Sequence, residues 1–185
     1  MEPLADSNLI VIGASVGGVN AMLGLAAALP PDFPAPILFV QHIGAHPSRL
    51  PELVSAQGPN PAVAPQDGEV PAAGTIYIAP PDHHMLLEDG AIRLSRGPKE
   101  HHARPAIDPL FRSAALCCGR RAVGVILTGA LDDGTAGLRA IKQCGGIAVV
   151  QDPQDAIEPS MPLSALACVD PDFVVPLAGM AQLLT

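Results

Sequence analysis

The sequence has no tryptophan, one tyrosine and only four phenylalanines among its 185 residues. Because hydrophobic residues still make up 49% of the chain, the core must consist mainly of Val, Ile, Leu and Ala side chains. Such side chains are typical of buried parallel strands and of the helices that cover them. The length suits one domain with a substantial core, so we expect a single domain over residues 1–185.

Positive charge is also scarce, with 10 Lys and Arg against 18 Asp and Glu and a formal net charge of −8. Nucleic acid is therefore not an expected partner, because phosphate binding needs a basic face. The sequence has no apolar run of membrane-spanning length and no basic region followed by an apolar stretch, as a signal peptide has. We expect a cytoplasmic protein without membrane insertion.

Cysteine and histidine patterns typical of metal sites are missing as well. The four cysteines, at positions 117, 118, 144 and 168, form no Cys-x-x-Cys motif and lie in apolar segments, so we expect reduced thiols. Two pairs of adjacent histidines, at 83–84 and 101–102, have no clear set of Cys or carboxylate ligands beside them. We therefore predict no metal and no organic cofactor, and we place these histidines in a polar rim around the functional site.

Apolar strands and helical segments alternate along the chain. Strands are expected near residues 8–13, 36–41, 75–79, 122–128, 146–151 and 172–176, and helices over 18–29, 47–57, 105–118, 135–144, 160–167 and the C-terminus. Asp89-Gly90 predicts the turn of a β-hairpin over about residues 84–95. This alternation predicts a doubly wound α/β fold, with a mostly parallel sheet and helices on both faces.

The most informative motif is Gly13-Ala-Ser15-Val-Gly17, which follows the first apolar strand. A Gly-x-Ser-x-Gly pattern can place a serine on a sharp strand-to-helix turn, near the N–H groups of the following helix. Such a serine can attack a carbonyl while those N–H groups stabilise the developing negative charge. Taken alone, the motif also fits a glycine-rich turn that only begins a helix or binds a phosphate.

Two further segments supply the partners that a serine nucleophile needs. His42 follows the second strand, and Asp132 and Asp133 follow the strand at 122–128. The carboxyl ends of parallel strands meet at one edge of a sheet, so these side chains are expected to approach Ser15. The histidine would accept the serine proton, and an aspartate would orient the imidazole and stabilise its charged form. Individually, the histidine also fits a polar loop residue and the aspartates fit helix caps.

The chain order Ser-His-Asp differs from the Ser-Asp-His order of α/β-hydrolases, so the glycine motif does not assign that fold. Together, the motifs resemble the catalytic domain of the CheB-type protein-glutamate methylesterases. The matching segments are Ile12-Gly-Ala-Ser15-Val-Gly-Gly18, Phe39-Val-Gln-His42, Ile78-Ala-Pro-Pro-Asp-His-His84, Arg104-Pro-Ala-Ile-Asp108-Pro-Leu-Phe111 and Leu127-Thr-Gly-Ala-Leu-Asp-Asp133-Gly134.

The resemblance implies hydrolysis of glutamate γ-methyl esters on chemoreceptor signalling helices, with release of methanol and, in some members, deamidation of glutamine. It implies that Ser15 is the nucleophile, that His42 is the base and that the aspartate is Asp133 rather than Asp132. The expected partners are methylated receptor helices or a related signalling protein. The resemblance implies no metal and no cofactor.

The sequence departs from the family pattern beside the expected site. Val16 stands where threonine is common, and Ala130-Leu131 stands where the family usually has Met-Gly. We expect the backbone N–H groups of Val16 and Ala130 to stabilise the oxyanion. The family often carries a receiver domain before this catalytic domain. Because the first strand begins near residue 8, we expect a catalytic domain without a receiver, either regulated by a protein in trans or constitutively active.

Two other functions stay open from the sequence. One is a non-enzymatic, nucleotide-binding Rossmann-like module, favoured by the glycine-rich turn. Against it, the full Gly-x-Gly-x-x-Gly spacing and an acidic ribose partner are not evident. The other is a serine esterase that acts on a substrate other than a chemoreceptor, since a fold does not determine its substrate.

Overall fold

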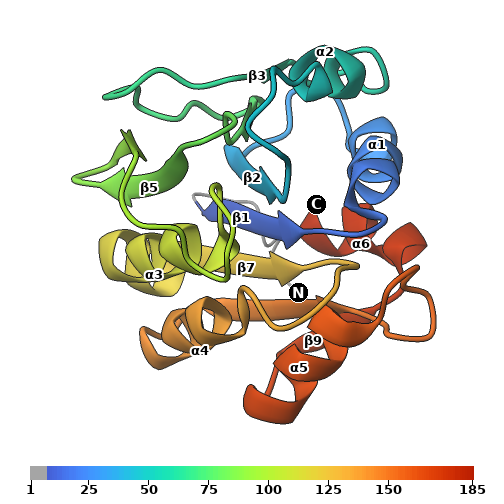
Figure 1. Cartoon of the computed structure of the whole chain (residues 1–185). Coiled ribbons are helices and arrows are strands. Elements are labelled where there is room, and N and C mark those ends of the chain that lie inside the picture. The colour runs from blue at the N-terminus through green and yellow to red at the C-terminus, as the bar shows by residue number, and fades with distance from the viewer. Residues whose placement is uncertain (1–7) are drawn as a thin grey trace.

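The computed structural model describes residues 8–185, and a seven-stranded parallel sheet forms its centre (Figure 1). The strand order is β3-β4-β2-β1-β7-β8-β9, with every neighbouring pair parallel. The strands are β1 (Leu9–Ala14), β2 (Ile37–Gln41), β3 (Ala62–Val63), β4 (Ile76–Ile78), β7 (Ala122–Ile126), β8 (Ile147–Gln151) and β9 (Phe173–Val175).

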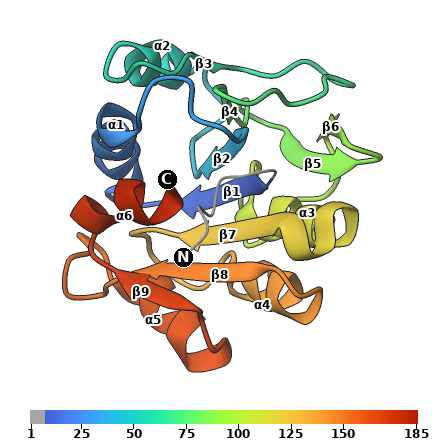
Figure 2. The same cartoon turned by 180° about the vertical axis from the view of Figure 1, so that it is seen from behind.

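Helices cover both faces of this sheet (Figures 1 and 2). One face packs against α1 (Gly18–Ala28), α2 (Leu50–Ser55) and α6 (Leu177–Leu184). The other face packs against α3 (Ile107–Cys118), α4 (Thr135–Gln143) and α5 (Ser160–Cys168). The antiparallel hairpin of β5 (His84–Glu88) and β6 (Ala91–Ser95) joins this second face. The predicted doubly wound α/β fold with a hairpin near 84–95 is therefore confirmed.

The central strand shows how an aliphatic sequence builds two cores. Ile10 and Ile12 belong to the cluster under α1 and α6, whereas Val11 belongs to the cluster under α3 and α4. All six residues of β1 are buried, so the strand has no polar face, as expected for a parallel strand covered on both sides. Each fully buried side chain of this size contributes about 1.5–3 kcal/mol, which is why so few aromatic residues suffice.

The order in which strands are added to the sheet reverses at β1. As a result, the loops after β1 and β7 lead to opposite faces of the sheet. β1 leads into α1 on one face, whereas its neighbour β7 leads toward α4 on the other face. Loops that diverge in this way leave a crevice at the carboxyl ends of the strands, where open α/β folds bind ligands. Ser15, His42 and the segment 127–134 follow β1, β2 and β7 at this edge.

The sequence pattern does not predict β3 or the 3₁₀ turn at Gly119–Arg121. β3 has only two residues, Ala62 and Val63, which pair with β4 at the edge of the sheet, and so short a strand carries no periodic signal. The four cysteines are free thiols, as expected, although Cys168 is exposed at the end of α5 rather than packed. Within residues 8–185, no helix is long and apolar enough to span a bilayer.

Candidate active site

Ser15 lies on the tight turn between β1 and α1. Gly17 has a φ of +80°, a left-handed conformation that favours glycine, and a Cβ there would lie 2.9 Å from the Cβ of Ile157. The N–H of Gly18 donates to the carbonyl oxygen of Ser15 at 2.9 Å and closes the turn where α1 begins. The glycines after Ser15 therefore allow the strand to reverse directly behind the serine side chain.

His42 links Ser15 to Asp133 from the carboxyl end of β2. Its Nδ1 lies 3.1 Å from Ser15 Oγ, and its Nε2 lies 2.7 Å from Asp133 Oδ2. If Nε2 donates its proton to the carboxylate, Nδ1 presents its lone pair to the hydroxyl and can accept the serine proton. The serine protease template uses the ring the other way round, with Nε2 toward the serine. The His42 side chain is 20% exposed, which leaves this end of the sheet open to a substrate.

Asp133 is almost completely buried and accepts three hydrogen bonds. Besides His42, the donors are the N–H groups of Ile107 at 2.7 Å and Asp108 at 3.0 Å, the first two residues of α3. Ala106, which precedes α3, has no side chain that can cap it, so Asp133 supplies the cap from another loop. Burial raises the pKa of Asp133, but the hydrogen bonds from His42 and the two N–H groups outweigh it, and the pKa is lowered overall.

A second carboxylate, Asp108, extends this network toward α4. It accepts the N–H of Gly137 at 2.6 Å and pairs with His101 Nε2 at 2.9 Å. His101 also approaches Asp132 through Nδ1 at 3.4 Å and Asp133 through Nε2 at 3.7 Å. Burial lowers the pKa of His101, but the hydrogen bond to Asp108 and the surrounding carboxylates outweigh it and raise the pKa overall. The two buried carboxylates therefore connect the first turns of α3 and α4.

One group within residues 8–185 has ligand atoms close enough to hold a metal. It consists of His101, Asp108 and Asp133, whose ligand atoms lie within 4.8 Å of one another. Both oxygens of Asp133 already accept N–H groups, and one oxygen of Asp108 accepts a helix N–H. A metal would have to share or displace these bonds, so the donor set fits helix capping better than metal binding.

The two predicted oxyanion donors belong to the loops that follow β1 and β7. Within the described residues, the N–H groups of Val16 and Ala130 have no hydrogen-bond partner, whereas those of Ser15 and Gly129 bond to backbone carbonyls. A Cβ on Gly129 would lie 2.9 Å from the Cβ of Ser15, so this loop runs directly against the serine. Neither N–H group therefore has an acceptor within the described protein, as an oxyanion donor would require.

Two polar residues that we did not include in the predicted site hold these loops together. Gln41, which is buried, donates from Nε2 to the carbonyl oxygens of Ser15 at 2.8 Å and His42 at 3.2 Å. Thr128, also buried, donates from Oγ1 to the carbonyl oxygen of Val16 at 2.9 Å. A polar residue at the end of each apolar strand is the sequence signal for both positions.

Polar contacts also fix the segment 96–106 near the site. Arg104 pairs with Asp82 at 2.6 Å and donates to the carbonyl oxygen of Gly97 at 2.7 Å. His84 lies within hydrogen-bond distance of the carbonyl oxygen of Pro98 through Nε2 and accepts the N–H of Ala106 through Nδ1. Because His84 is buried, the expectation that it belongs to a polar rim is wrong for this residue. Both of its ring nitrogens contact backbone groups inside the fold.

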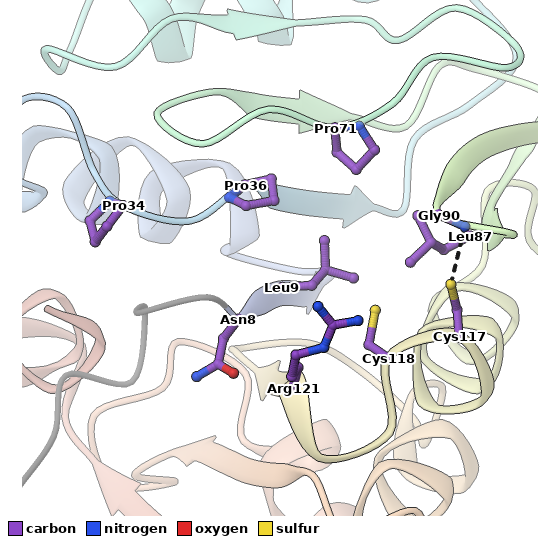
Figure 3. Close-up of a pocket in the computed structure, with 10 residues that line it drawn as sticks. All are labelled: Asn8, Leu9, Pro34, Pro36, Pro71, Leu87, Gly90, Cys117, Cys118 and Arg121. Atoms are coloured by element: carbon purple, nitrogen blue, oxygen red, sulfur yellow. Dashed lines mark hydrogen bonds between the residues drawn. The ribbon is translucent and has the colours of Figure 1, made fainter.

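A pocket of about 290 Å³ lies at the opposite, amino end of the sheet (Figure 3). Leu9, Cys117 and Cys118 are among the residues that line it, and neither Ser15 nor His42 is. Burial raises the pKa of the Cys118 thiol to about 11, and the neighbouring Cys117 adds to this effect. The thiol is therefore protonated near neutral pH and a poor nucleophile, and the pocket has no part in the chemistry at Ser15.

The sequence matches a protein family described as CheB methylesterase over residues 10–184. A relative from Leptospira interrogans, named a putative protein-glutamate methylesterase/protein-glutamine glutaminase, is 41% identical over 94% of this chain and 91% of its own length. A protein-glutamate methylesterase/protein-glutamine glutaminase from Anaeromyxobacter dehalogenans is 39% identical over 97% of this chain. The chain spans 53% of that second relative.

A solved structure has the same fold. The crystal structure of the Thermotoga maritima CheB methylesterase catalytic domain superposes with a TM-score of 0.91 at 31% sequence identity. The match covers 96% of each chain. The two structures therefore share the same overall fold over nearly the whole length.

Proposed function

The chain belongs to the CheB methylesterase family, and from this premise we propose that it hydrolyses glutamate γ-methyl esters on chemoreceptor signalling helices through Ser15, His42 and Asp133. The chain is an enzyme of the protein-glutamate methylesterase class. The observation that supports this chemistry most is the continuous hydrogen-bonded chain from Ser15 Oγ through both nitrogens of His42 to Asp133. It lies at the edge of the sheet where α/β folds bind substrates.

In the first step, Ser15 Oγ attacks the ester carbonyl carbon while His42 Nδ1 accepts the hydroxyl proton. The carbonyl oxygen becomes negatively charged and accepts hydrogen bonds from the N–H groups of Val16 and Ala130. When the tetrahedral intermediate collapses, the bond to the methoxy oxygen breaks and His42 returns the proton to it. Methanol leaves, and the glutamyl group is held as an ester on Ser15.

In the second step, water takes the place of methanol. His42 Nδ1 removes a proton from the water molecule as its oxygen attacks the acyl-serine, and the same N–H groups stabilise the second oxyanion. Collapse returns the proton to Ser15 and frees a glutamate carboxylate. The two steps balance as ester plus water giving acid plus methanol, with no redox change.

Asp133 supports both steps by remaining ionised. Its low pKa keeps it negatively charged near neutral pH, and its bond to Nε2 keeps the proton on that nitrogen, away from Ser15. When His42 becomes an imidazolium, the adjacent carboxylate stabilises the new charge. Because Asp133 is also held by two helix N–H groups, it cannot rotate away from the imidazole without losing those bonds.

Deamidation of glutamine is a second activity that the names of the relatives favour, since both are also called protein-glutamine glutaminases. The same attack on a side-chain amide would release ammonia in place of methanol. A protonated leaving nitrogen is required, and His42 is placed to supply that proton after the attack.

Mass spectrometry of a methylated chemoreceptor cytoplasmic fragment tests the proposal. Wild-type protein should remove the mass of one methylene at each esterified glutamate, and Ser15→Ala, with unchanged circular dichroism, should remove none. An increase of about one mass unit at glutamines would add the deamidase activity. Unchanged ester in both samples would contradict the proposal, and a thermal shift with nucleotides would then test the Rossmann-like binding alternative.

A further inference from the structure

Leu131 adopts a backbone conformation that its side chain disfavours. Its φ is +68°, in the left-handed region where glycine and asparagine are common and a bulky residue is strained. Burial of the side chain does not offset this strain, because Leu131 is 70% exposed. Glycine would adopt this φ without strain. Residues strained in this way cluster at active sites and binding sites.

The position of Leu131 in the chain puts it between two parts of the proposed machinery. Gly129 runs against Ser15, and Asp133 bonds to His42. Because consecutive Cα atoms are about 3.8 Å apart, the Cα of Leu131 lies within about 7.6 Å of both Gly129 and Asp133. It directly follows Ala130, a proposed oxyanion donor. A substrate carbonyl bound there brings the rest of the substrate close to Leu131.

Two other exposed aliphatic side chains belong to loops near Ser15. Val16, directly after Ser15, is 52% exposed, and Ile157 is 67% exposed. Ile157 lies against the turn at Gly17, where an added Cβ would be 2.9 Å from its Cβ. Exposed aliphatic side chains are therefore present in three separate loops, of which two contact or contain the turn that carries Ser15.

We propose that Leu131 is a specificity-determining residue, which contacts an aliphatic side chain of the substrate helix one turn away from the esterified glutamate. This inference rests on the proposed function. On a helix, residues three and four positions from the reacting side chain lie about 5–6 Å from it, within reach of a leucine beside the oxyanion donor.

Charge favours an aliphatic partner over an acidic one. The protein has a formal net charge of −8, and the Asp132 side chain beside Leu131 is 66% exposed. A glutamate is neutral while it is esterified, so it can approach this surface, whereas a free carboxylate one turn away would be repelled by Asp132. An aliphatic side chain at that position meets Leu131 without such repulsion.

The test distinguishes the effect of losing the Leu131 side-chain contact from the effect of changing the backbone strain. Leu131→Asn suits the left-handed φ but removes the apolar contact, Leu131→Met keeps the contact, and Leu116→Gln removes another exposed leucine, from α3. Methanol release is measured against concentration of a methylated receptor cytoplasmic fragment. We expect Leu131→Asn to raise KM about tenfold with kcat within about twofold of wild type, and its Tm to equal or exceed that of wild type. The Met and Leu116 variants should keep the wild-type KM.

A second fragment identifies the partner side chain. It carries asparagine, a neutral residue that Asp132 does not repel, in place of the aliphatic residue four positions from the methylation site. Wild type should lose about tenfold in kcat/KM with this fragment, and Leu131→Asn should lose much less, because the contact is already absent.

An unchanged KM in Leu131→Asn, while wild type releases methanol, would overturn the inference and leave the proposed function intact. A fall in kcat alone would also overturn it, because Leu131 would then position the catalytic loop rather than bind the substrate. Absence of methanol release by wild type would overturn both.

Discussion

Replacing Asp133 by asparagine keeps the shape of the side chain but removes one acceptor. Oδ2 accepts from His42 and Ile107, and Oδ1 accepts from Asp108. If the asparagine oxygen faces His42, its NH₂ group opposes the N–H of Asp108. If the amide is reversed, the NH₂ group faces Nε2 and forces the imidazole proton onto Nδ1. That nitrogen is then unable to accept the proton of Ser15.

Both orientations have a cost that can be measured. With the wrong tautomer, kcat should fall about 10⁴-fold, as in serine proteases that carry the corresponding change. An unsatisfied buried donor at the start of α3 should lower the free energy of unfolding by about 1–3 kcal/mol. For a domain of this size, that corresponds to a Tm lower by about 2–12 °C. Methanol release from a methylated receptor fragment and urea unfolding measure the two effects.

Asp132→Asn is the matched control. The Asp132 side chain is 66% exposed and lies 3.4 Å from His101 rather than near His42. We expect its kcat within about twofold of wild type, because it makes no contact with the triad. The reasoning would be refuted if Asp133→Asn kept both the wild-type free energy of unfolding and a kcat within about tenfold of wild type, or if Asp132→Asn were equally harmful.

Three other predictions concern the surrounding residues. Ser15→Ala should keep the Tm within about 2 °C of wild type and abolish methanol release, and measurable turnover above background would contradict the assigned nucleophile. In Gln41→Leu the carbonyl oxygen of His42 loses its buried donor. We expect kcat to fall about tenfold or more and the free energy of unfolding to fall by about 1–3 kcal/mol. Kinetics and urea unfolding equal to those of wild type would refute a positioning role. His101 has a pKa raised above its ordinary value of 6.5, so its protonated form stabilises the folded state fully below that pH. This contribution is lost as pH rises through the folded pKa. His101→Gln should therefore be destabilised more at pH 5.5 than at pH 8.5 in urea unfolding, and an equal difference at both values would be against the interaction with Asp108.

The fold follows largely from local sequence patterns. Each long apolar strand is bounded by glycine, proline or polar residues, so the positions of β1, β2 and β7 could be predicted within about two residues. β3 could not, because two residues at a sheet edge carry no period and their pairing with β4 depends on tertiary structure. The hairpin could be predicted because Asp89-Gly90 supplies a turn with its own strong preference.

The approach of Ser15, His42 and Asp133 was open to prediction because all three follow strands of one parallel sheet. Which histidine nitrogen faces the serine depends on the position of the ring, and the sequence has no signal for it. The capping of α3 by Asp133 likewise joins residues that are distant in sequence. Leu131 shows the same limit, since its left-handed φ appears only in the folded loop.

The most direct test of the central claim is methanol release from a methylated chemoreceptor cytoplasmic fragment, with wild type and Ser15→Ala compared at equal concentration and confirmed as folded. We predict methanol in proportion to the ester present for wild type, and none above the uncatalysed rate for Ser15→Ala. Equal release by both proteins would contradict the serine mechanism, and release by neither would contradict the proposed reaction.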